Sequence, residues 1–101
     1  MTVQSKISRR TDRFAMEAPA RIKTFGATKP EKVTLSDLSA VGCQLSPAHS
    51  MTTGARLLVK ISGLDYRPAT VLWKRQDRVG IEFEKPLHPR SVQDYARHHA
   101  N

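Results

Sequence analysis

The sequence predicts an all-β domain, a six-stranded antiparallel β-barrel with a short C-terminal helix and a flexible N-terminal arm. Six short segments carry apolar residues at every second position, which is the period of a strand with one buried face. Turn residues separate these segments and no helical pattern lies between them, an arrangement typical of antiparallel barrels and sandwiches. A closed barrel also leaves few exposed strand edges, which suits a chain of 101 residues with a modest core.

The six expected strands follow one another with short connections. They cover residues 14–22, 33–37, 42–46, 57–61, 69–73 and 79–83. Pro19 interrupts the first strand, so we expect it at an edge position or a bulge, because proline donates no backbone hydrogen bond. In the fourth strand Leu57, Val59 and Ile61 stand at every second position. Glycine-containing turns, such as the one at 62–65, connect the strands.

After Pro86 the apolar spacing changes from two to the helical period. Val92, Tyr95, Ala96 and His99 share one face of a helix that we expect at about 89–99, with Ser91 as a candidate cap. This helix should pack on the barrel. The expected organisation is therefore a flexible lead-in at 1–8 and a single domain over 9–101.

Several functional classes find no support in the sequence. There is no run of the roughly 20 apolar residues needed to span a bilayer and no signal-peptide pattern, so we expect a cytoplasmic protein. The single Cys43 cannot form an internal disulfide or hold a metal alone, and its surroundings suggest a small buried residue. The four histidines show no metal-ligand spacing, and no catalytic set is recognisable. We expect neither an enzyme nor a cofactor or metal.

The net charge of +8 indicates an anionic partner. Positive charge is concentrated at the N-terminus, since residues 1–29 carry a net charge of +5 and the remaining 72 residues carry +3. We therefore expect an anionic ligand or surface to bind close to the part of the domain against which the N-terminal segment folds.

Two short motifs carry the chemistry that an anionic ligand would need. The first is the R-x-x-x-R pattern formed by Arg9 and Arg13, with Arg10 between them; the second is Asp37-Leu38-Ser39-Ala40-Val41-Gly42. A guanidinium can fork onto O6 and N7 of guanine, stack on a purine or clamp a phosphate. In an extended segment, Asp37 and Ser39 would face the same side. The carboxylate could then accept hydrogen bonds from N1–H and N2–H₂ of a guanine, and the two motifs together suit a ligand with phosphates and guanines.

Each residue also has an ordinary structural interpretation. The arginine cluster by itself is compatible with a solvated tail, and Asp37 and Ser39 with the capping of a turn. Trp73 stands at an apolar position of the fifth strand, so a core or rim role competes with stacking on a ligand. Gly42, without a Cβ, can adopt a positive φ or allow close approach of a ligand or of another segment.

In their order and spacing, these motifs resemble the signature of the PilZ domain family. That signature combines an N-terminal R-x-x-x-R, a D/N-x-S-x-x-G after the second strand, and a later strand with a G-x-x-F run, here Gly80-Ile81-Glu82-Phe83. The segment 69–73 also looks like the family's fifth strand. The resemblance extends from residue 9 to about 85, and the joint occurrence of the motifs, rather than any single motif, carries it.

The resemblance implies a six-stranded barrel that binds cyclic di-GMP. By position, Arg9 and Arg13 would be the principal ligand residues with Arg10 as a neighbour, Asp37 and Ser39 would contact a guanine edge, and Gly42 would shape the backbone. Ligand binding would order the arginine arm onto the barrel and change the surface presented to a separate downstream effector protein. The free protein is expected to be a monomer that does not insert into membranes.

Two other functions remain open at this point. A basic β-barrel that binds RNA or single-stranded DNA is compatible with the charge, but such proteins usually offer several exposed aromatic side chains as stacking platforms. Here most of the six aromatic residues occupy alternating, core-like positions. A PilZ-like adaptor that has lost nucleotide binding is the second alternative, and the intact Arg9, Arg13, Asp37 and Ser39 argue against it.

Overall fold

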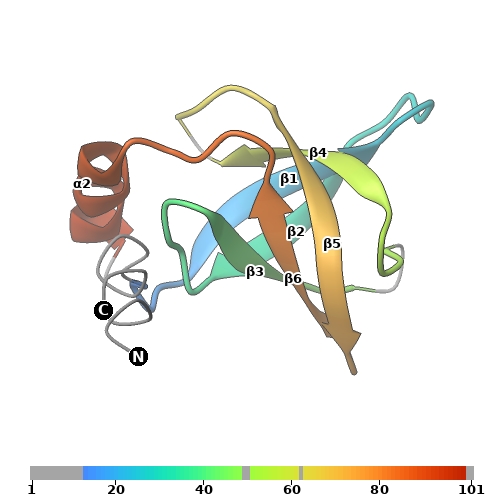
Figure 1. The fold of residues 1–101 in the computed structure, drawn as a ribbon, viewed down its shortest axis with the longest axis horizontal. Coiled ribbons are helices and arrows are strands. Elements are labelled where there is room, and N and C mark those ends of the chain that lie inside the picture. The colour runs from blue at the N-terminus through green and yellow to red at the C-terminus, as the bar shows by residue number, and fades with distance from the viewer. Residues whose placement is uncertain (1–12, 49–50, 62, 100–101) are drawn as a thin grey trace, which may run out of the picture.

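The chain forms a closed β-barrel with one helix packed beside it (Figure 1). A computed structural model describes residues 13–48, 51–61 and 63–99. The strands are β1 (Ala18–Thr24), β2 (Glu31–Ser36), β3 (Gly42–Ser46), β4 (Arg56–Ile61), β5 (Arg67–Arg75) and β6 (Arg78–Phe83), and the helix is α2 (Pro89–His99). Around the barrel their order is β1-β2-β3-β6-β5-β4, and every neighbouring pair is antiparallel. The predicted fold class is confirmed.

The alternation in the sequence determines which side chains fill the barrel. Ile22, Leu35, Leu45, Val59 and Val71 are at most 1% exposed and face inward from five different strands. Because successive side chains of a strand point to opposite faces, the residues between them line the outer wall. The outer wall therefore carries the polar residues that are available to a ligand.

The first strand begins later than the alternation predicts. Its ladder starts at Ala18, whereas Phe14 forms an isolated bridge with Leu38, with hydrogen bonds of 2.8 and 3.0 Å between their backbone groups. Pro19 pairs only with β2, because pairing with β4 begins at Ala20. The expectation of an edge position for Pro19 is thus correct, and the segment before the strand turns toward the loop that follows β2.

The C-terminal helix packs against the barrel and has the expected bounds, but its capping residue differs from the expected one. Val92 and Ala96 are buried and belong to the same apolar cluster as the barrel interior. Ser91, the expected cap, lies inside the helix, and the His88 side chain instead accepts a hydrogen bond of 3.1 Å from the backbone N–H of Arg90. Within the described residues, no helix is long and apolar enough to cross a membrane.

Cys43 points into the barrel and is 5% exposed, which confirms the expected buried residue. Burial, and secondarily the negative charge of Asp37, raise the pKa of this thiol above its ordinary value. An unfolded chain releases the thiol proton at about pH 8.5, while the folded chain retains it at that pH. We therefore expect the free energy of unfolding to fall above that pH, by up to about 1.4 kcal/mol per pH unit from this group.

Urea unfolding at a series of pH values between neutrality and pH 10 measures this dependence. A Cys43→Ala variant, although less stable at neutral pH, should show a shallower decline over the same range. Equal slopes for the two proteins would contradict the assignment.

Candidate functional site

The loop between β2 and β3 begins with an unusual backbone conformation at Asp37. Its φ of 62° lies in the left-handed region, which aspartate tolerates better than most residues with a Cβ. The extended segment assumed from the sequence is therefore wrong at this residue. The left-handed turn sends Leu38 into the core, and the Asp37 side chain stays partly exposed on the outer wall, with 26% of its surface accessible.

Ser39 organises the rest of this loop. Its hydroxyl accepts hydrogen bonds from the backbone N–H groups of Val41 and Gly42, at 3.3 and 3.2 Å, and donates to the Gly42 carbonyl at 3.3 Å. The Ser39 N–H donates to the same carbonyl at 2.9 Å. A hydroxyl has one donor and two acceptor positions, so Ser39 is fully occupied within the turn. The capping interpretation of Ser39 is thus realised, and the residue is 5% exposed.

Gly42 allows β3 to approach β6 closely. A Cβ at this position would collide with the carbonyl oxygen of Ile81 and would lie 3.3 Å from the Cα of Glu82. Of the two roles considered for this glycine, close approach of another segment is the one that the structure shows.

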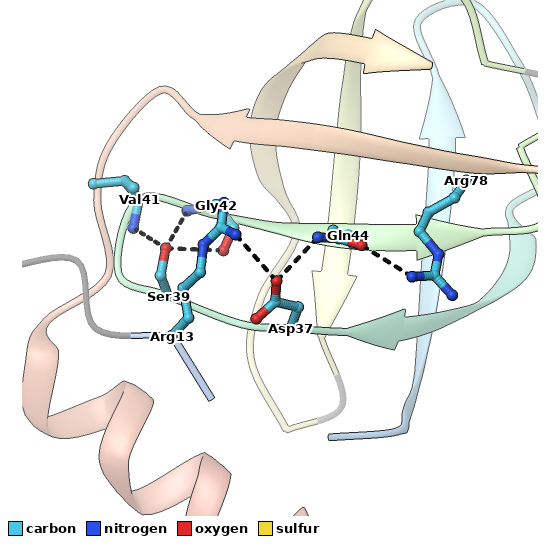
Figure 2. Close-up of polar contacts among 7 residues, drawn as sticks. All are labelled: Arg13, Asp37, Ser39, Val41, Gly42, Gln44 and Arg78. Atoms are coloured by element: carbon cyan, nitrogen blue, oxygen red, sulfur yellow. Dashed lines mark hydrogen bonds and ion pairs between the residues drawn. The ribbon is translucent and has the colours of Figure 1, made fainter. Parts of the chain in front are cut away.

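A chain of polar contacts runs across the outer wall from Arg13 to Arg78 (Figure 2). Arg13 Nη1 lies 3.3 Å from Asp37 Oδ2, and the amide of Gln44 donates to the same oxygen at 2.9 Å. Arg78 donates in turn to Gln44 Oε1 at 3.3 Å. Both hydrogen bonds to Asp37 end on Oδ2, and no described residue donates to Oδ1. Among the described residues, the second carboxylate oxygen therefore has no hydrogen-bond donor.

Trp73 reaches the same wall because β5 contains a bulge. Val71 lies opposite Ile81 and Trp73 lies opposite Gly80, so Leu72 is an extra residue that shifts the register. The shift turns Trp73 out of the inward alternation that the sequence suggested. Its indole lies over Gly80, where a Cβ would clash with the ring. Trp73 is half-buried on the outer wall and is not part of the core cluster.

These side chains converge on one recess of the outer wall, with a volume of about 100 Å³. Its lining residues are Arg13, Asp37, Ser39, Val41, Gly42, Cys43, Gln44, Leu72, Trp73, Gly80, Ile81 and Glu82. Residues distant in the sequence are thereby brought together: the end of the N-terminal segment, the Asp37 loop, and strands β3, β5 and β6. The recess is smaller than typical ligand pockets of about 300–1,000 Å³. The described residues alone therefore enclose less space than such pockets do.

Of the residues expected at the site, Arg13, Asp37, Ser39, Gly42 and Trp73 line this recess. Arg9 and Arg10 lie outside the described residues. Gln44 and Arg78, which extend the polar chain, were not among the residues expected at the site. Gln44 could have been found by parity, since it stands two positions after Gly42 and so faces the same side of β3.

A recess lined by an arginine, a carboxylate and an indole on the outer wall of a small barrel is a candidate ligand-binding site. The sequence matches the PilZ domain over residues 7–99, nearly the whole chain. The chain therefore belongs to the PilZ domain family. PilZ domains are receptor or adaptor domains for cyclic di-GMP rather than enzymes. A search of curated proteins finds no match.

Proposed function

We propose that this protein is a cytoplasmic, monomeric receptor for cyclic di-GMP that works without catalysis. The observation that carries the proposal is the meeting of Arg13, Asp37 and Trp73 at one recess of a PilZ barrel. The ligand combines two phosphates with two guanines. A site for it must therefore offer cationic groups for the phosphates and a hydrogen-bond acceptor for the edge of a guanine. The recess offers these groups side by side.

The contacts suggest a distinct role for each side chain. The Arg13 side chain is 68% exposed, and only one of its guanidinium nitrogens contacts Asp37. Its remaining N–H groups can bind a phosphate or a guanine face. Asp37 Oδ1 can accept from N1–H or N2–H₂ of guanine. The exposed part of the Trp73 ring, whose centroid lies 5.6 Å from the Arg75 guanidinium, can pack against a base. Ser39 and Gly42 would contribute by holding the loop that places Asp37.

The small volume of the recess supports a role for the N-terminal arm. A nucleotide of this size needs further walls, and we propose that Arg9 and Arg10 supply them together with Arg13. The bound ligand would order the arginine segment against the barrel and change the surface that a separate effector protein contacts. Repulsion among these arginines in the free protein would be relieved by the two phosphates.

Trp73 provides a direct test, because it is the only tryptophan in the chain. We expect cyclic di-GMP to change the intensity or the emission maximum of its fluorescence in a saturable manner, since the ligand would replace water around the indole. GMP, which has one guanine and one phosphate, serves as the control and should require a much higher concentration. A signal that GMP reproduces at equal concentration would argue against specific recognition of the dinucleotide.

Amide chemical shifts separate this proposal from that of an adaptor without a ligand. A receptor should show shifts concentrated in residues 5–15 and 35–43 during a titration with cyclic di-GMP. A PilZ-like adaptor that does not bind nucleotide would show none, and its tryptophan fluorescence would stay constant as well.

A further inference from the structure

Three cationic side chains form a row across the barrel wall that faces away from the recess. Arg21 on β1 lies directly opposite Lys32 on β2 and directly opposite Lys60 on β4. All three are exposed. Neighbouring strands are about 4.8 Å apart, so the backbone positions of this cationic row span roughly 10 Å. In the closed order of strands, β1 is opposite β6, which carries one side of the recess.

Within the described residues, no carboxylate oxygen lies within 4.0 Å of a charged nitrogen of the cationic row. Arg21, Lys32 and Lys60 form no ion pair there, whereas Arg56 on the same wall pairs with Glu84 at 2.6 Å. Like charges directly opposite each other on neighbouring strands destabilise a sheet. The requirements of folding therefore do not account for this row, and an anionic partner would relieve its repulsion.

The row borders a shallow depression with a volume of about 760 Å³. Its other lining residues are Pro19, Ala20, Val33, Gly63 and Tyr66. Tyr66 is 36% exposed, and the Lys60 ammonium lies over its ring, 5.7 Å from the centroid. The depression thus combines three cations with a small apolar surface.

We propose that the cationic row binds an acidic, helical segment of a partner protein. A depression accommodates a narrow convex rod such as a helix, whereas a flat lipid surface could not reach into it. Glutamates at i, i+3 or i+4, and i+7 stand about 5–6 Å apart along one helix face, close to the spacing of the strands. Single-stranded nucleic acid needs open aromatic faces, and here the one aromatic ring already has an ammonium over it. The proposal goes beyond nucleotide binding and does not depend on it.

The test uses the full chain and a labelled helical peptide of about 18 residues with glutamates at i, i+4 and i+7. We expect saturable binding by fluorescence anisotropy at low ionic strength, with amide shifts centred on Arg21, Lys32 and Lys60. The triple variant R21Q/K32Q/K60Q should weaken binding by about tenfold or more. Its thermal midpoint should rise, because repulsion within the row is removed.

The matched control is K29Q/K85Q/R90Q, which removes the same charge from three other exposed cations. This variant should keep its affinity for the peptide, and both variants should bind cyclic di-GMP like the parent chain. Equal loss of peptide affinity in both triple variants would show a response to net charge alone and overturn the proposal. Tighter, row-dependent binding of a single-stranded oligonucleotide or of anionic lipid vesicles would overturn it as well. If the parent chain did not bind cyclic di-GMP, the proposed function would be wrong, but the proposal for the cationic row would be unaffected.

Discussion

Replacing Arg13 by alanine is expected to weaken cyclic di-GMP binding at least tenfold while the barrel stays folded. Loss of a charge-assisted contact to a phosphate or a guanine removes about 1.5–3 kcal/mol, and tenfold corresponds to about 1.4 kcal/mol. The fold should tolerate the change, because the pair with Asp37 is exposed at the arginine end and such pairs contribute about 1 kcal/mol or less. Calorimetric titration of the folded variant measures the effect.

Arg90→Ala is the matched control, since this arginine is also exposed but lies on α2 and does not line the recess. It should bind cyclic di-GMP with the affinity of the parent chain. Arg9 lies outside the described residues. If the N-terminal arm supplies part of the site, Arg9→Ala should weaken cyclic di-GMP binding as much as Arg13→Ala does. Unchanged affinity in the Arg13 variant, with an intact thermal transition, would refute the proposed ligand role.

Replacing Gly42 by alanine is expected to destabilise the barrel strongly. The added methyl group would collide with the backbone carbonyl of Ile81, and a backbone atom paired in a closed barrel cannot move aside as a flexible side chain can. Overpacking of this kind costs about 3 kcal/mol. For a domain of this size, that loss lowers the thermal midpoint by about 12–24 °C. Circular dichroism during heating measures the midpoint.

Gly26→Ala is the comparison that isolates the collision. Gly26 has a φ of 88°, so alanine is strained there, but nothing lies within 4 Å of the added Cβ. The expected cost is about 1–2 kcal/mol from backbone strain alone. If the two variants lost equal stability, the close approach of β3 and β6 would not be the reason for glycine at position 42.

The elements that were predicted well depend on local pattern. Leu57, Val59 and Ile61 alternate without interruption, and the observed β4 covers them. The pattern failed where pairing partners decide the outcome. Phe14 continues the apolar alternation of the first strand, but it does not belong to the ladder with β2, which begins at Ala18. Phe14 instead forms an isolated bridge with Leu38, in the loop after β2. The bridge between Phe14 and Leu38 also places Arg13 next to Asp37.

The candidate site also combines features that are visible in the local sequence with features that depend on pairing between distant strands. The motifs around Arg13 and Asp37 were visible as residue types at fixed spacing. The outward turn of Trp73 was not, because it results from one extra residue in β5 relative to β6. Arg78 was missed for a related reason, since its hydrogen bond to Gln44 joins two strands that are far apart in the sequence.

By itself, the sequence determined a small all-β barrel with a terminal helix and a set of arginine, carboxylate and glycine motifs. Side-chain alternation, turn residues and motif spacing are properties of neighbouring residues, so one chain is enough to recognise them. Only the tertiary structure decided which strand ends meet, which side chains share the recess, and that Arg21, Lys32 and Lys60 stand side by side. Register and closure depend on contacts between residues far apart in sequence, where a shift of a single residue exchanges the inner and outer faces.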